Sequence, residues 1–119
     1  MLSSTILIRP VEKDEVSILL DLIHQKAAFD QQMDSGCTPL SATVEKLEQT
    51  LFGDRPFAQT LLVECDRTLV GFALYYFRYS SFAAQPSLWL DDLYLNEQVR
   101  GQGIGTRLMM ELMAIAPLY

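Results

Sequence analysis

The sequence predicts one α+β domain in which a mixed, mostly antiparallel sheet is flanked by helices. Half of the 119 residues are apolar, which is enough for a core and far from a disordered composition. Apolar residues recur at helical spacing in three segments and gather in strand-like runs in four others. Two of these runs are separated only by Asp66-Arg67, so we expect an antiparallel hairpin there.

The chain begins with a short strand and a helix. We expect Thr5 to Arg9 to form the strand, which Pro10 closes. Asp14 is expected to cap the helix, which fades near Asp30 to Asp34. Its inner face is predicted from residues at helical spacing: Val16, Leu19, Leu20, Ile23 and Ala27.

A second helix is predicted after a loop at residues 35–39. Ser41 is a candidate cap, and Gly53-Asp54-Arg55-Pro56 ends the helix. Its inner face comprises Val44, Leu47 and Leu51.

Three further strands complete the predicted sheet. They cover Thr60 to Cys65, Leu69 to Tyr79 and Leu88 to Leu95, with a loop from Ser80 to Ser87 between the last two. A last helix, residues 104–116, directs Ile104, Leu108 and Leu112 one way, with Met109 and Met113 beside them.

A glycine-rich turn joins the last strand to the last helix, with the sequence Arg100-Gly101-Gln102-Gly103-Ile104-Gly105-Thr106. Backbone N–H groups at a helix start can hold a phosphate, and glycine lets an anion approach closely. Arg100 adds a guanidinium that can pair with phosphate oxygens. We interpret the turn as a pyrophosphate site, while an ordinary tight turn is the alternative. The spacing does not fit a dinucleotide fold, and a P-loop would end in Gly-Lys-Ser/Thr.

This turn, after a strand reading Leu90-Asp91-Asp92-Leu93-Tyr94-Leu95, resembles the acetyl-CoA loop of the GNAT acyltransferases. Ile8-Arg9-Pro10 and the run from Leu69 to Phe77 extend the likeness, in order, to the diamine branch of that family, which acts on spermidine, spermine and thialysine. The resemblance implies a GNAT-type acyl-CoA N-acyltransferase fold and acetyl-CoA as co-substrate. It places the pyrophosphate on residues 100–106. The pantetheine arm and thioester are expected at the backbone of Leu93, Tyr94 and Leu95.

The resemblance also suggests where an amine would bind. Asp91 takes the position of an acidic residue at the amine, where a carboxylate can attract an ammonium and accept its proton through water. The alternative is an ordinary strand-end carboxylate, either solvated or paired with Arg100 or Arg107. Because neighbours on a strand point to opposite faces, we expect Asp92 to be structural. Phe29 and Asp30 match positions that contact polyamines, although a surface carboxylate is the plainer interpretation of Asp30.

The chain departs from this family in two respects. Ser80 and Phe82 stand where the spermidine enzymes carry an acidic residue and a Trp, which leaves smaller amines open as substrates. The family's domain continues past the last helix with further strands and a general-acid tyrosine, a role that we do not assign to Tyr119. We therefore expect residues 1–119 to form a single, C-terminally truncated N-acetyltransferase domain. Its open strand edge would be covered by a second copy, making a homodimer, or by another polypeptide.

Composition excludes several classes. A net charge of −6 argues against nucleic-acid binding. Cys37 and Cys65 have no metal or disulfide spacing, and His24 stands alone, so we expect no metal site and a cytoplasmic location. No signal peptide and no membrane span is predicted.

We therefore predict an N-acetyltransferase that moves the acetyl group of acetyl-CoA directly to a primary amine of a small molecule. The expected substrate is a diamine, a polyamine or the side-chain amine of an amino acid. Two alternatives are a truncated GNAT domain without turnover that binds CoA or a protein partner, and a plain α/β domain with an ordinary glycine turn.

Overall fold

The computed structural model describes residues 5–33 and 40–116 and contains one four-stranded sheet with helices on both faces. Its elements are, in order, β1 (Ile6–Pro10), η1 (Lys13–Glu15), α1 (Val16–Met33), α2 (Val44–Phe52), β2 (Gln59–Cys65), β3 (Thr68–Ser80), β4 (Gln85–Leu95), η2 (Glu97–Val99) and α3 (Ile104–Ile115). The strands lie in the order β1-β2-β3-β4, and each neighbouring pair is antiparallel. The predicted fold class is confirmed.

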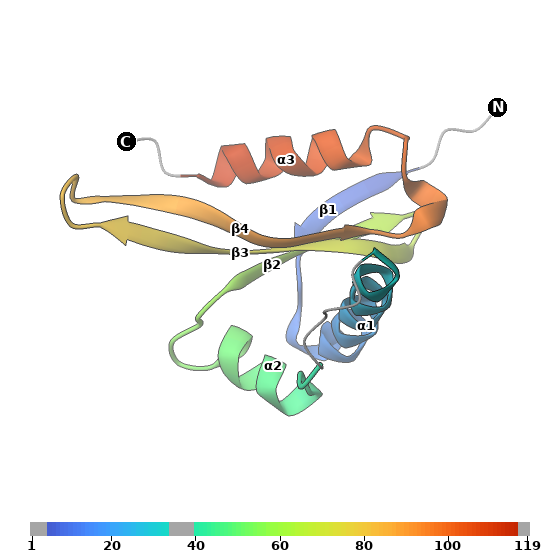
Figure 1. The fold of residues 1–119 in the computed structure, drawn as a ribbon, viewed down its shortest axis with the longest axis horizontal. Helices are drawn as coiled ribbons and strands as arrows, with labels where there is room; N and C mark the ends of the chain where they lie inside the picture. The colour runs from blue at the N-terminus through green and yellow to red at the C-terminus, as the bar shows by residue number, and fades with distance from the viewer. Residues whose placement is uncertain (1–4, 34–39, 117–119) are drawn as a thin grey trace.

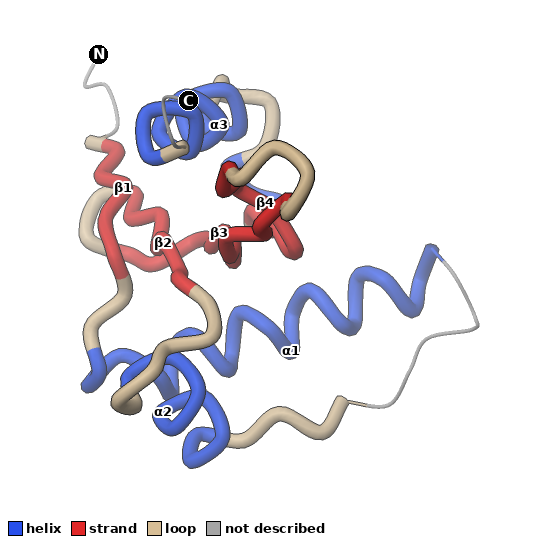
Figure 2. Tube along the Cα trace, turned by 90° about the vertical axis from the view of Figure 1, so that its left-hand side faces the viewer, coloured by secondary structure: helices blue, strands red, loops and turns tan. Residues whose placement is uncertain are grey.

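A separate hydrophobic cluster packs on each face of the sheet. Helix α3 covers one face, and α1 with α2 covers the other (Figures 1 and 2). Consecutive strand residues alternate between the clusters: Leu61 and Val63 face α3, whereas Leu62 faces α1 and α2. The α3 side contains Ile104, Leu108 and Leu112, as predicted. The α1 side contains Val16, Leu19, Leu22, Leu47, Leu51, Phe72 and Tyr94, of which Leu22 was not predicted.

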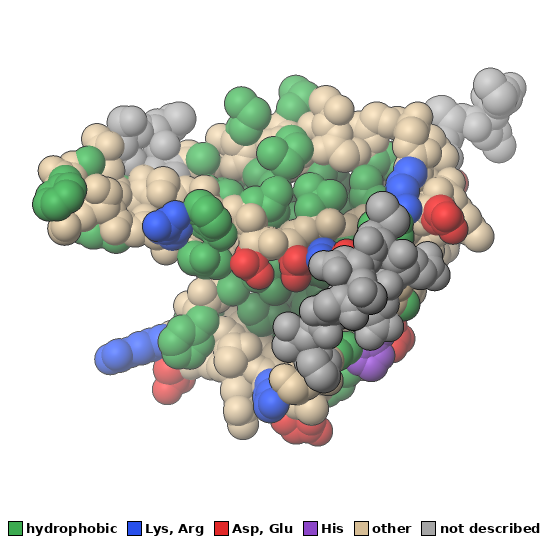
Figure 3. Space-filling view, viewed as in Figure 1, with side chains coloured by type: hydrophobic (Ala, Val, Ile, Leu, Met, Phe, Trp, Pro, Cys, Tyr) green, Lys and Arg blue, Asp and Glu red, His purple; other side chains and the backbone are tan. Residues whose placement is uncertain are grey.

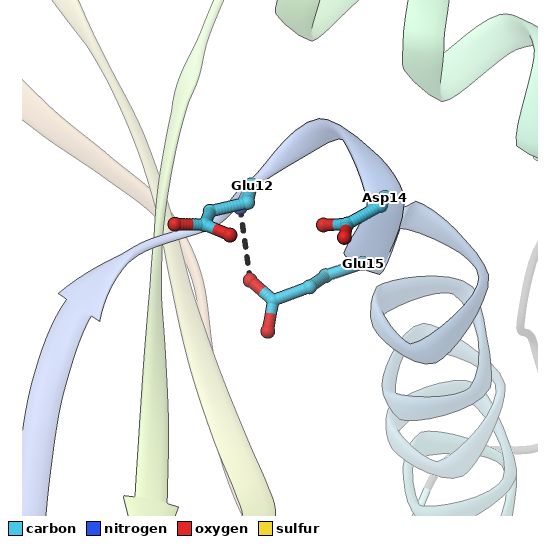
Figure 4. A group of neighbouring side chains, drawn as sticks. All are labelled: Glu12, Asp14 and Glu15. Carbon is cyan, nitrogen blue, oxygen red and sulfur yellow. Dashed lines mark hydrogen bonds between the residues drawn. The ribbon is translucent and has the colours of Figure 1, made fainter.

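An ion-pair cluster fixes the entry into α1, and Figure 4 shows the acidic residues Glu12, Asp14 and Glu15 at this point. The prediction that Asp14 caps the helix is wrong, because η1 precedes α1 and its N-cap residue is Glu12. The Glu12 N–H donates to Glu15 Oε1 at 3.0 Å. The Arg9 guanidinium donates to both oxygens of Glu15, at 2.8 and 2.7 Å, and to Glu64 at 3.2 Å. The cluster therefore ties β1, η1 and β2 together.

Helix α2 also begins at a different residue from the one predicted. Its N-cap is Thr43, whose hydroxyl accepts from the Lys46 N–H at 3.1 Å. Ser41 lies outside the helix, and its carbonyl accepts from the Lys46 ammonium instead. Leu47 and Leu51 are buried, as predicted.

Strands β3 and β4 form a long hairpin that projects beyond the rest of the sheet (Figure 1). The predicted loop from Ser80 to Ser87 is wrong in its second half, because β4 already begins at Gln85 and pairs with Ser80. Only residues 81–84 turn the chain, with Ala84 at a φ of 52°. Phe82 at the turn is fully exposed.

A β-bulge interrupts β4 in the middle of its pairing with β3. Leu74 pairs with Asp92, but the next residue, Tyr75, pairs with Leu90, so Asp91 is the extra residue. Leu90 and Leu93 consequently pack against the same cluster although they are three positions apart. Simple alternation fails at this point, and it was the basis for expecting Asp91 and Asp92 to point to opposite faces.

Candidate active site

A groove of about 440 Å³ lies between the C-terminal half of α1 and the end of β4. It is lined by Lys26, Phe29, Asp30, Leu93, Tyr94, Leu95 and Arg100. The groove therefore brings together the two regions that the sequence nominated separately, one for an amine and one for acetyl-CoA. Figure 1 shows α1 passing beneath the end of the sheet from which the glycine turn departs.

The β4 wall of this groove is held in place by an unusually close approach of two strands. Gly71 of β3 pairs with Leu95, and a Cβ atom at Gly71 would meet the Tyr94 carbonyl oxygen at 2.4 Å. The N–H of Asn96 donates to the Val70 carbonyl at 2.7 Å, which extends the pairing past the end of β4. Among the described strands β4 pairs only with β3, so the other edge of Leu93–Leu95 borders the groove.

The glycine turn adopts a conformation that favours glycine at two positions. Gly101 and Gly103 have φ values of 80° and 78°, and no atom lies within 4 Å of where their Cβ atoms would stand. Gly103 is the N-cap of α3, and its carbonyl accepts the N–H of Arg107 at 3.2 Å. Because the helical ladder begins there, the N–H groups of residues 104–106 have no acceptor within the helix. They form the positive end of α3, beside open space.

Arg100 lies over the groove. Its Nε donates to the Leu95 carbonyl at 2.8 Å. Its guanidinium carbon stands 4.5 Å from the centre of the Phe29 ring and 5.6 Å from that of Tyr94, which is within cation–π range. Arg100 thus bridges α1 and β4.

A cluster of three charges lies at the α1 side of the groove, with Lys26 and Asp30 from α1 and Asp92 from β4. The Lys26 ammonium donates to Asp30 at 2.6 Å and lies 3.1 Å from an Asp92 oxygen. The hydrogen bond that Lys26 donates to Asp30 contributes most to raising the pKa of Lys26, and Asp92 adds to it, while partial burial opposes the shift. The sequence interpretation missed Lys26, although its i,i+4 spacing to Asp30 was visible. It also expected no site contact for Asp92, which lies here beside Asp30.

Asp91 is exposed at the bulge, next to this cluster in sequence. Over residues 5–33 and 40–116 its carboxylate makes no hydrogen bond or ion pair, so neither expected pairing, with Arg100 or with Arg107, is present. A solvated carboxylate beside a chain bulge can accept a proton from bound water.

The remaining candidates are placed as follows. Tyr94 is buried on the α1 side, and its hydroxyl donates to Gln25 Oε1 at 3.3 Å. Burial raises the pKa of Tyr75, which packs on the α3 side. Ser80 and Phe82 lie at the far end of the hairpin, and His24 is on the exposed side of α1.

The family described as "Acetyltransferase (GNAT) family" matches residues 27–118, which include α1 from its middle, the whole of β4 and the glycine turn. The chain belongs to the GNAT acetyltransferase family. Members of this family transfer an acetyl group from acetyl-CoA.

Three relatives illustrate the range of similarity. Thialysine N-ε-acetyltransferase of Sus scrofa is 27% identical over 121 residues, which span 95% of this chain and 68% of that protein. The spermidine/spermine N(1)-acetyltransferase-like protein 1 of Homo sapiens is 32% identical over 92% of this chain and 16% of its own length. The structure of an aminoglycoside N-acetyltransferase in complex with CoA superposes with a TM-score of 0.67 at 19% identity, covering 95% of this chain and 70% of that one.

Two further features concern membrane insertion and metal binding. Within the described ranges, no helix is both long and apolar enough to cross a bilayer. The carboxylates of Glu12, Asp14 and Glu15 lie within 4.8 Å of one another. Glu15 is already bonded to Arg9 and to the Glu12 backbone, so this group is accounted for as the start of α1.

Proposed function

We propose that this GNAT domain transfers the acetyl group of acetyl-CoA directly to the primary amine of a small molecule. One observation carries the proposal: Leu93–Leu95 at the free edge of β4 and Arg100 line one groove, and the glycine turn and the N-terminus of α3 follow them directly in the chain. The N–H groups of residues 104–106, with Gly101 and Gly103, would hold the pyrophosphate. The edge of β4 would bind the pantetheine arm.

The chemistry required of the chain is modest. The amine nitrogen attacks the thioester carbonyl carbon, the C–S bond breaks, and CoA leaves as the thiol. A backbone N–H at the β4 edge, near the bulge, would stabilise the developing oxyanion, a contribution on the order of 3 kcal/mol. Asp91 would accept the amine's proton through water, since a primary amine arrives protonated at neutral pH. Phe29, Asp30 and Asp92 would border the amine.

The proposed substrate is a diamine, a polyamine or an amino-acid side chain. Support comes from the carboxylates Asp30 and Asp92 at the groove and from relatives named for thialysine, spermidine and spermine. The exposed methionines of α3 are Met109, Met110 and Met113. Hydrophobic side chains reach the upper surface in Figure 3, on the side where α3 lies in Figure 1. We further propose that a second copy covers the exposed face of α3, which the mass in solution would test.

Calorimetric titration with acetyl-CoA tests the cofactor site. Gly103→Val places a β-branched residue at positive φ and should weaken binding at least about tenfold, because the turn that orients the N–H groups is distorted. Ala84→Val is the matched control: it imposes a similar strain at positive φ, but at the hairpin turn far from the groove. It should bind as the parent chain does.

Turnover is measured separately, by release of the CoA thiol in the presence of small primary amines. Binding with turnover supports the whole proposal. Saturable binding without turnover of any amine would leave a CoA-binding domain and overturn the enzymatic part. A folded parent chain that does not bind acetyl-CoA would overturn the cofactor site as well.

A further inference from the structure

We propose that Lys26 is a specificity-determining residue, which makes the groove accept singly charged amines and amino-acid amines in preference to polyamines. The inference rests on the proposed function, because it concerns the amine side of the same groove. Its basis is that the place where two carboxylates converge is already occupied by an ammonium of the chain itself.

The contacts of Lys26 are short and come from two elements. Its ammonium is 2.6 Å from Asp30 on α1 and 3.1 Å from Asp92 on β4. The Lys26 side chain is only 22% exposed, less than that of either carboxylate. An arriving ammonium would therefore meet the outer, solvent-facing side of Asp30 and Asp92, with a fixed positive charge directly behind them.

The groove is not lined by an excess of negative charge. Lys26, Arg100 and Asp30 line it, and Asp92 lies against Lys26, although the chain as a whole carries −6. A groove built to attract a polycation would be expected to be net negative. Each additional ammonium on a substrate would meet repulsion from Lys26 and Arg100, while Asp30 and Asp92 are already paired with Lys26.

Amino-acid amines would gain a contact that plain amines lack. A lysine ammonium has three donors, and Asp30 and Asp92 account for two of those on Lys26. The third can donate to a substrate carboxylate. A substrate with an amine at one end and a carboxylate near the other thus matches the alternating charges of Asp30, Lys26 and Asp92.

The test compares butylamine and free lysine, which each carry a net charge of about +1 at neutral pH, with spermidine, which carries about +3; lysine alone has a carboxylate. Lys26→Met removes the ammonium but keeps a side chain of similar length. In this variant the affinity for spermidine relative to butylamine should rise at least about tenfold, because two carboxylates lose their internal partner. Lys26→Arg should keep the parent preference. Lys13→Met, on η1 and exposed, removes the same charge far from the groove and should change neither affinity.

Binding of each amine to the CoA-bound protein is followed by NMR titration, and acetylation by thiol release, so the two proposals can fail separately. A tenfold shift in relative affinity without acetylation would support the role of Lys26 and overturn the proposed enzyme activity. Acetylation with an unchanged spermidine-to-butylamine ratio in folded Lys26→Met would overturn the role of Lys26 alone. Failure of the parent and of Lys26→Met to bind any of the three amines would also overturn the role of Lys26.

Discussion

Two clusters of similar composition lie on the α1 side of the sheet, and only one of them lies at the candidate active site. In the first, Arg9 is bonded to Glu15 and Glu64. In the second, Lys26 is bonded to Asp30 and Asp92. Each is one cation between two carboxylates. Only the second lines the groove with Arg100 and the end of β4.

The difference between the cations explains the difference in role. The Arg9 guanidinium is a planar fork that engages both oxygens of Glu15, and Glu15 also accepts the Glu12 N–H, so the geometry is fixed from several sides. The Lys26 ammonium is a point charge on a flexible stem, and its contacts to Asp30 and Asp92 leave one of its three donors for a ligand. We conclude that the first cluster stabilises the fold and the second tunes binding.

The sharpest way to break this comparison is to remove each cation in turn. Arg9→Met should lower the free energy of unfolding by about 2 kcal/mol, because Glu15 and Glu64 lose charge-assisted hydrogen bonds in a half-buried site. Lys26→Met should lower it by less than about 1 kcal/mol, because its partners are more exposed. Urea unfolding of both variants measures the difference.

Arg9→Lys serves as the control for this first prediction. It keeps the charge but loses the bidentate fork, so it should lie between the parent and Arg9→Met. Equal losses for Arg9→Met and Lys26→Met would contradict the division into a structural and a binding cluster.

Lowering the pH should weaken the ion pair between Arg9 and Glu15 in the first cluster. The hydrogen bond from Arg9 is the largest cause of the lowered pKa of Glu15, and partial burial opposes it. A depressed folded-state pKa means that the stabilisation is complete above the unfolded value, near 4.5, and is lost as the pH falls through the folded-state value. The free energies of unfolding of parent and Glu15→Gln, measured with urea, should therefore differ by about 1 kcal/mol at pH 6. They should converge as the pH falls through the folded-state pKa of Glu15. A gap that does not change with pH would rule out this linkage.

The sequence predicts the elements better than the contacts between them. Helical and strand periodicity placed the three α-helices and four strands of the described residues to within a few residues, because the clusters on the two sheet faces follow local spacing, whereas the short helices η1 and η2 were not predicted. The spacing of the leucines in β4 indicates the bulge. Leu88 and Leu90 share one face, as do Leu93 and Leu95, but the odd spacing from Leu90 to Leu93 would put the two pairs on opposite faces of a regular strand. That signal was present but was not used.

Other features could not be obtained from local patterns. The Lys26–Asp92 pair joins α1 to β4 across most of the chain, so only the folded structure brings it together. The capping choice between Ser41 and Thr43 depends on where the helix enters, since both residue types can cap. The engagement of Arg100 with Leu95 and Phe29 likewise requires the groove to exist first.

Raising the pH should weaken the second cluster, and this is the smallest of the predicted effects on stability. The pKa of Lys26 is raised, mainly by its hydrogen bond to Asp30. A raised folded-state pKa means that the stabilisation is complete below the unfolded value of 10.5 and is lost as the pH rises through the folded-state value. Because the carboxylates are partly exposed, we expect the free energies of unfolding of parent and Lys26→Met to differ by less than about 1 kcal/mol at pH 8, and the gap should close as the pH rises through the folded-state pKa of Lys26. Repeating the urea unfolding in 1 M salt should shrink that gap, whereas the half-buried Arg9 cluster should be less sensitive. If the Lys26 gap persisted in high salt and strong alkali, the ammonium would be held as firmly as the Arg9 guanidinium, and the assignment of the second cluster to binding would be untenable.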